Sequence, residues 1–84
     1  MNTIFKYDLE IKDEQTLSLP ADSEIISIDY QGENLCAWIK VDTDKPERDR
    51  KIIIVGTGHP IQCNSMRHLA TVQRDGFVWH VFDN

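Results

Sequence analysis

Apolar and polar side chains alternate along most of this chain of 84 residues. A two-residue period is expected of a β-strand with one face buried and the other in solvent. The alternation predicts one strand over 4–12 and another over 24–31, because apolar side chains recur there at every second position. The positions expected on their buried faces are Phe5, Tyr7, Leu9, Ile11, Ile26, Ile28 and Tyr30.

Three other segments have patterns that place them within a sheet. A short strand is predicted over 16–19, and because Pro20 ends it and cannot donate to a ladder, it should lie at a sheet edge. The segment 35–41 is apolar at both parities, which is typical of a central strand. The segment 51–57 contains the most apolar run in the chain, so we expect it in the middle of a sheet as well.

The clearest local signal is a hairpin near the end of the chain. Asp75-Gly76 separates two runs of β-type residues, 69–74 and 77–82. Asp-Gly favours the two-residue turn that matches the twist of paired strands. The sequence therefore predicts that these two runs pair with each other.

Two segments break the alternation. Residues 42–51 contain four acidic and four basic side chains, and we expect them to form a long, solvated hairpin loop. Asn64 and Ser65 are residue types that cap helices, so they are expected to begin a single helical turn through Met66 and Arg67.

The fold class follows from these elements and from the composition. Fifteen residues are Val or Ile, whereas Leu, Ala and Met together number ten, and β-branched side chains favour strands. About seven strands joined mostly by short turns are typical of a small antiparallel β-sandwich or barrel. We therefore predict a single all-β domain over residues 1–84, with at most one short helical turn.

The net charge of −5 is unevenly distributed. Residues 1–44 contain three basic and ten acidic side chains, whereas 45–84 contain six basic and four acidic ones. An acidic chain without a basic stripe is a poor match for direct nucleic-acid binding or for electrostatic attachment to a membrane. We expect neither.

Cysteine content and hydropathy indicate a compartment. Cys36 and Cys63 are too few for the disulfide framework of a small secreted domain. The first residues lack the features of a secretory signal, and the longest apolar run, 52–55, is far shorter than a membrane span. These features predict a cytoplasmic protein.

Three residues have spacings that invite comparison with a zinc site. His59, Cys63 and His68 lie four and five residues apart, and Cys36 or His80 would have to supply a fourth ligand. The chain has no Cys-x-x-Cys pair and these intervals match no common zinc motif. We therefore expect no metal and no cofactor.

Catalysis would require side chains that the sequence does not bring together. His59 or His80 would act as a general base with Asp29, and Cys36 or Cys63 as the nucleophile. Nothing in their spacing fixes a common geometry, and a chain of this length has little room to enclose a pocket. We expect that the protein is not an enzyme.

Aromatic side chains are the strongest candidates for a binding surface. Tyr30, Trp38 and Trp79 contribute more aromatic surface than one small core easily covers, and Tyr and Trp dominate binding hot spots. Gly58 and His59 are further candidates, although glycines after a buried strand mostly permit a tight turn or bulge.

Several segments are together similar to one family. They are 4–9, 13–16, 19–20, 35–38, 54–61 and 78–82, and the Gly-Thr-Gly-His-Pro element within 54–61 is the most specific. Over nearly its whole length the chain resembles a family of short proteins encoded by phages and prophages. The family has no assigned activity, so the resemblance implies only a setting, that of a phage accessory protein in the bacterial cytoplasm.

These observations predict a non-catalytic module that binds a host or phage protein, as an inhibitor or modulator of a host factor. In one variant of this hypothesis the acidic side chains cluster and imitate nucleic acid; they are Asp8, Glu10, Asp13, Glu14, Asp22, Glu24, Asp29 and Glu33. The alternative is a self-assembling structural protein, either a homodimer or a minor virion component. A small metal- or ligand-binding protein is the third possibility.

Overall fold

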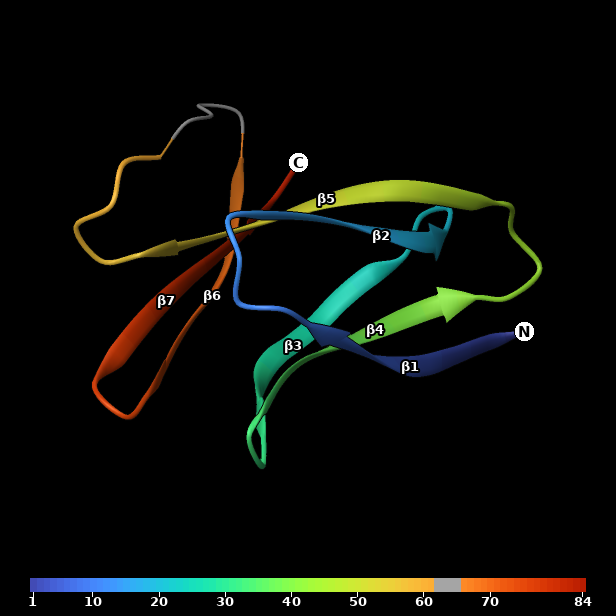
Figure 1. Cartoon of the computed structure of the whole chain (residues 1–84). Helices are drawn as coiled ribbons and strands as arrows, with labels where there is room; N and C mark the ends of the chain where they lie inside the picture. Colours follow the sequence, from blue (N-terminus) through green and yellow to red (C-terminus); the bar gives the residue numbers. More distant parts are fainter. Residues whose placement is uncertain (62–65) are drawn as a thin grey trace.

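The computed structural model describes residues 1–61 and 66–84, and its regular elements are seven β-strands (Figure 1). The strands are β1 (Asn2–Leu9), β2 (Glu14–Pro20), β3 (Glu24–Gln31), β4 (Asn34–Asp42), β5 (Glu47–Gly56), β6 (Arg67–Arg74) and β7 (Phe77–Asp83). The predicted all-β class is confirmed.

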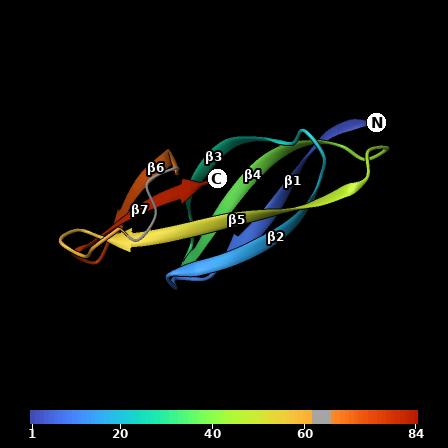
Figure 2. The same ribbon diagram turned by 90° about the horizontal axis from the view of Figure 1, so that it is seen from above.

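The strands form two antiparallel sheets that pack face to face as a small sandwich (Figure 2). One sheet has three strands in the order β1-β4-β3, and the other has four in the order β2-β5-β7-β6. The predicted central places of β4 and β5 and the predicted edge place of β2 are all confirmed.

The core lies between the inner faces of the two sheets. Every second residue of β4 from Leu35 to Val41 contributes to it, and β5 contributes Ile52 and Ile54, as the alternation requires. The buried cluster consists of Leu9, Leu19, Ile28, Leu35, Ala37, Ile39, Val41, Ile52, Ile54, Val72 and Val81.

The predicted terminal hairpin is present. β6 and β7 pair in antiparallel register up to Arg74 and Phe77, and the turn between them is Asp75-Gly76. Both turn residues have positive φ, 52° and 83°, which the two-residue turn requires and which glycine adopts without strain.

The strand predicted over 4–12 is shorter than expected. β1 ends at Leu9, and Ile11 lies in the following turn with 43% of its surface exposed. The side-chain amide of Gln15 bonds to both the backbone N–H and the carbonyl of Glu10, at 3.1 and 2.8 Å. Because these bonds occupy the backbone of Glu10, the chain turns before Ile11 can join the buried face.

The prediction that Ile26 is buried is wrong. β3 carries a bulge between Ile25 and Ser27, so Ile26 is the extra residue of the strand. A bulge reverses the parity of the side chains on its two sides. Ile25 therefore packs against the core with Ile28, while Ile26 is 50% exposed.

The long charged loop predicted over 42–51 is also wrong. β5 begins at Glu47, and its charged first half pairs with β2 from Pro20 to Thr16. The charges are tolerated because these side chains find ionic partners, as in the 3.1 Å pair between Lys51 and Glu14 and the 3.6 Å contact of Arg50 with Asp83. β4 and β5 lie in different sheets, so they do not form a hairpin.

The helical turn predicted through Met66 and Arg67 is not seen at those two residues, because Arg67 begins β6. Asn64 and Ser65 lie outside the described residues. Within residues 1–61 and 66–84, no helix has the length and hydropathy to cross a membrane.

Candidate protein-binding groove

An open groove lies where two hairpin turns from opposite sheets approach each other. One turn joins β3 to β4, and the other joins β6 to β7 (Figure 1). The groove has a volume of about 290 Å³. Its lining residues are Ile11, Tyr30, Glu33, Arg74, Asp75, Phe77 and Trp79. We call this the aromatic groove.

Two stacked rings form the apolar part of the aromatic groove. The rings of Phe77 and Trp79 have centroids 5.9 Å apart and planes inclined by 12°. The alternation along β7 places both on the inner face with Val81, which is fully buried in the core, and Trp79 packs half-buried against that core. Phe77 remains 61% exposed, which is unusual for a ring on the inner face of a sandwich.

Arg74 connects the two hairpin turns across the aromatic groove. Its guanidinium donates a hydrogen bond to the carbonyl of Gly32 and lies 5.2 Å from the centre of the Tyr30 ring. Its Nε is also 3.6 Å from a carboxylate oxygen of Asp75. These contacts hold Tyr30 of β3 near the stacked rings of β7. The groove is therefore formed before any partner binds.

The groove combines two of the predicted binding residues, Tyr30 and Trp79, with five other residues. Of these five, Glu33 was expected only as one member of an acidic cluster, and Arg74 and Phe77 were not expected as binding residues from the sequence. The positions flanking Asp75-Gly76 could have indicated Arg74 and Phe77, because residues next to a hairpin turn extend beyond the core. Their proximity to Tyr30 depends on the packing of the sheets, which a local pattern does not contain.

Gly58 and His59 lie in the turn that follows β5. The N–H of His59 bonds to the carbonyl of Gly56 at 3.0 Å, and Gly58 has a φ of 89°, so the glycine has a structural role in this turn. A Cβ atom on Gly56 would lie 3.1 Å from Nδ1 of His59 and 3.2 Å from the ring of Trp79. The His59 ring therefore packs on the backbone of Gly56, close to Trp79.

A second hollow, of about 250 Å³, lies beside this turn. It is lined by His59 and Pro60, by the strand residues 53–55 and by the acidic pair Asp13 and Glu14. Glu14 is already ion-paired with Lys51.

Trp38 does not line the aromatic groove. It pairs with Lys6 and Ser27, which places it on the outer face of the three-stranded sheet, half-buried. The structure therefore does not combine Trp38 with Tyr30 and Trp79 in one site.

The candidate catalytic residues are dispersed. His80 lies on the outer face of the four-stranded sheet, between the hydroxyls of Thr57 at 2.8 Å and Thr71 at 3.0 Å. Asp29 lies in the other sheet, opposite Cys36. Burial and the Asp8 carboxylate raise the pKa of the fully buried Cys36 thiol, which disfavours the thiolate that a nucleophile requires.

The candidate zinc ligands are not gathered either, as far as the structure describes them. His68 bonds to Thr71 at 3.0 Å on the outer face of β6, while His59 packs on Gly56. Cys63 lies outside the described residues. Among the residues that are described, no group of three or more His, Cys, Asp or Glu side chains is arranged to hold a metal ion.

The acidic side chains of the first half do not form one cluster. Glu10, Asp13 and Glu14 lie near the start of β2, whereas Asp22 and Glu24 follow its other end, about 20 Å away for a strand of seven residues. Several are paired with lysines, such as Glu10 with Lys12 and Asp22 with Lys45, both at 2.8 Å. This distribution does not support an imitation of nucleic acid.

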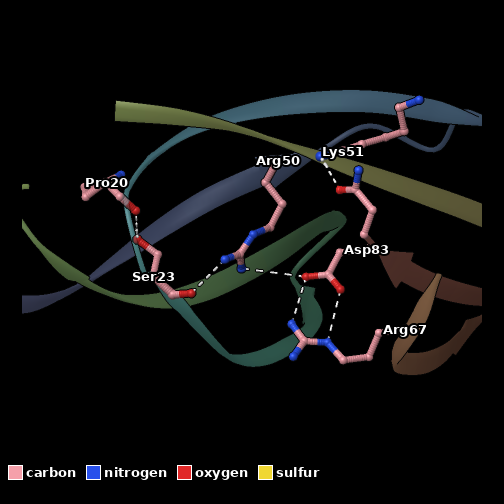
Figure 3. A network of polar contacts seen from close by, with 7 residues as sticks. Pro20, Ser23, Arg50, Lys51, Arg67 and Asp83 are labelled. Carbon is pink, nitrogen blue, oxygen red and sulfur yellow. Dashed lines mark hydrogen bonds and ion pairs between the residues drawn. The ribbon is translucent and has the colours of Figure 1, made fainter. Parts of the chain in front are cut away.

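The sequence did not indicate a buried ionic network at the end of β7. Asp83 is fully buried and accepts hydrogen bonds from Arg67 at 3.2 and 3.0 Å, while Nη1 of Arg50 lies 3.6 Å away (Figure 3). Nη2 of Arg50 also donates to the carbonyl of Ser23 at 2.9 Å. The network joins the four-stranded sheet to the connection between β2 and β3.

Comparison with known proteins shows the family. A sequence model described as "Domain of unknown function (DUF7352)" matches residues 1–84. The chain belongs to this family. No curated protein and no solved structure matches the chain significantly. A functional assignment for this DUF7352 chain therefore has to be argued from its own residues.

Proposed function

We propose that this DUF7352 chain is a non-catalytic protein-binding module that docks on a partner protein through the aromatic groove. The observation that carries the proposal is the exposed Phe77 ring, stacked on Trp79 at a preformed hollow. Burying the exposed 61% of a phenylalanine side chain removes about 120 Å² of apolar surface from water, worth about 3 kcal/mol. One such anchor is typical of a binding hot spot.

The chemistry of the rim favours a particular kind of partner. Arg74 is engaged by Gly32, Tyr30 and Asp75, so its charge is largely satisfied within the chain. Glu33 lines the same groove, and in the described part of the chain it has no ion-pair partner. The preferred partner segment presents an apolar side chain for the stacked rings and a neighbouring Lys or Arg for Glu33.

The setting of the proposal is a phage accessory protein that modulates a host or phage protein in the bacterial cytoplasm. Support comes from the resemblance of the chain to short phage and prophage proteins, including the Gly-Thr-Gly-His-Pro element. The small number of cysteines agrees with a reducing compartment.

A non-catalytic role is favoured by the separation of the reactive side chains. His80 and Asp29 lie in different sheets, and Cys36 is buried beside Asp8. The two hollows near the aromatic side chains, of about 250 and 290 Å³, are at the lower limit of the range from roughly 300 Å³ that ligand sites occupy.

The proposal is tested by affinity purification from phage-infected bacterial cells. The bait is the wild-type chain, the variant Phe77→Ser, or the control Ile26→Ser, which changes a residue of similar exposure on the other sheet. We expect a partner that is retained by wild type and control but lost with Phe77→Ser. Direct binding of the purified partner should weaken about 100-fold in this variant, corresponding to about 3 kcal/mol. Equal retention by all three baits contradicts the proposal.

A further inference from the structure

The four edge strands of the sandwich differ in how they resist pairing with another chain. In the part of the chain that the structure describes, β1 and β3 are the edges of one sheet and β2 and β6 of the other. β3 has a bulge at Ile26, and β6 has one between His68 and Ala70. β2 ends in Pro20, and its exposed side chains are polar. Bulges, prolines and polar edges are the usual protection against edge-to-edge association.

β1 has neither a bulge nor a proline, and its charged side chains are limited to Lys6 and Asp8. Its register with β4 is uninterrupted from Asn2 to Leu9, so its free edge is a regular row of backbone donors and acceptors. It also exposes apolar side chains on both faces, with Ile4 exposed to 56% and Phe5 to 43%. Phe5 lies on the inner face and Ile4 on the outer face of the sheet. A long, regular and apolar edge is a site where another strand adds.

We infer that β1 pairs antiparallel with β1 of a second copy of this chain, about a two-fold axis at Phe5. The two three-stranded sheets then form one continuous sheet of six strands. Seven residues of each strand, 2–8, take part in the new ladder. This self-association is independent of the aromatic groove and goes beyond the proposed partner binding.

The position of the axis follows from the alternatives along β1. Axes at Lys6 or Asp8 would place like charges directly opposite each other, which destabilises a strand pair. With an axis at Tyr7, Ile4 would be opposite Glu10. The backbone N–H and carbonyl of Glu10 are both bonded to Gln15, so they are not free to extend the ladder. An axis at Ile4 gives a ladder of only about five residues before the strand begins.

The Phe5 register satisfies the side chains as well as the backbone. It places the two half-exposed Phe5 rings against each other on the inner face, and such aromatic cross-strand pairs stabilise a sheet. On the outer face it sets Ile4 against the aliphatic stem of Lys6 and the Asp8 carboxylate against the amide of Asn2. The segment 2–8 has one positive and one negative side chain, so the two copies of the strand do not repel each other.

The first test measures the mass of the wild-type chain in solution by sedimentation equilibrium. At roughly 100 µM, above the dissociation constant of a small interface, we expect twice the chain mass of 9.7 kDa. A chain that remains monomeric at this concentration overturns the proposal, and a strand from another protein would then be the remaining occupant of the edge.

The second test maps the register by disulfide crosslinking in a Cys63→Ser background. Phe5→Cys should crosslink readily, because residues opposite each other have Cβ atoms about 5 Å apart. Tyr7→Cys lies on the same face, but its two copies would be about 13 Å apart, so it serves as the matched control. Equal crosslinking of both variants, or faster crosslinking of Tyr7→Cys, overturns the Phe5 axis.

A third arm retains the Phe5 ring. Ile4→Cys protein is mixed with Lys6→Cys protein, since residue 4 of one copy is opposite residue 6 of the other. We expect the mixed disulfide to dominate over crosslinks within either variant alone, as resolved by intact mass. If the mixed disulfide does not dominate, the Phe5 register is contradicted. This outcome does not depend on how Phe5→Cys affects the association, because both variants keep the Phe5 ring.

Discussion

The buried Asp83 network provides the most demanding prediction about stability. Asp83→Asn keeps the shape of the side chain but removes its charge, and the side chain is completely buried. Arg50 then loses the carboxylate 3.6 Å from its Nη1, an atom that is itself buried and makes no hydrogen bond. A buried guanidinium without a counter-charge is strongly unfavourable.

The magnitude follows from the exposure of the two arginines. Arg67 donates two hydrogen bonds to Asp83, and these bonds raise the pKa of Arg67. The side chain of Arg67 is 69% exposed, however, so in Asp83→Asn water replaces much of the interaction that Arg67 loses. Arg50 is only 22% exposed, so the cost arises mainly there. Breaking a buried pair costs about 3–5 kcal/mol, and partial exposure of Arg50 favours the lower end, about 3 kcal/mol. A domain of this size has a total stability of roughly 4–13 kcal/mol, so much of it would be lost.

The assay is urea unfolding followed by tryptophan fluorescence. With a slope of about 1.5 kcal/mol per molar urea, Asp83→Asn should lower the midpoint by about 2 M. Arg67→Gln should lower it less, because Arg67 is largely exposed. In the double variant Arg50→Met/Asp83→Asn no buried guanidinium is left without a counter-charge. The loss of unfolding free energy in the double variant should therefore be about 2 kcal/mol smaller than the sum of the losses in Arg50→Met and Asp83→Asn. An unchanged midpoint for Asp83→Asn, or strict additivity in the cycle, refutes the reasoning.

Three further outcomes are expected from the packing. Gly56→Ala should destabilise the fold by about 1–3 kcal/mol, because the new methyl group would lie 3.1 Å from the His59 ring and 3.2 Å from the Trp79 ring. Urea unfolding measures this loss, and an unchanged midpoint would contradict the packing. Cys36 should resist alkylation in the native state and react in urea, since burial both hides the thiol and raises its pKa. Peptide mapping by mass spectrometry measures the alkylation rate in each condition. Rapid labelling of the native chain would count against the burial of Cys36. Burial and the nearby Glu47 carboxylate also raise the pKa of Tyr7, so the part of the phenolate absorbance that Tyr7→Phe removes should appear above pH 10. Because the pKa of Tyr7 is higher in the folded than in the unfolded chain, its contribution to the free energy of unfolding is present below pH 10 and is lost as the pH rises through the folded-state pKa. Ionisation of Tyr7 below pH 10 would refute this.

The fold was largely predictable because it depends on a local period. Alternation located the strands, and an apolar surface on both faces identified β4 as central. The errors occurred where a single contact overrides the period. The Gln15 amide ends β1 before Ile11, and a bulge at Ile26 reverses the parity of β3. Neither event has a signature in the alternation itself.

The candidate site was only partly predictable for a related reason. Aromatic content correctly indicated Tyr30 and Trp79, but it grouped them with Trp38, which lies on the outer face of the three-stranded sheet. The pairing of Arg74 with Tyr30 joins residues 44 positions apart and depends on how the sheets pack. Burial of Asp83 depends on the same packing, and an aspartate is rarely fully buried unless it is paired.

The position of the two tryptophans allows the central claim, binding through the aromatic groove, to be measured directly. Trp38→Phe leaves Trp79 as the single fluorophore in the groove, and Trp79→Phe leaves Trp38 on the opposite sheet. Acrylamide quenching of each variant is compared with and without the purified partner. We expect the partner to shield Trp79 and to leave Trp38 unchanged; shielding of Trp38 with no effect on Trp79 would contradict binding through the groove.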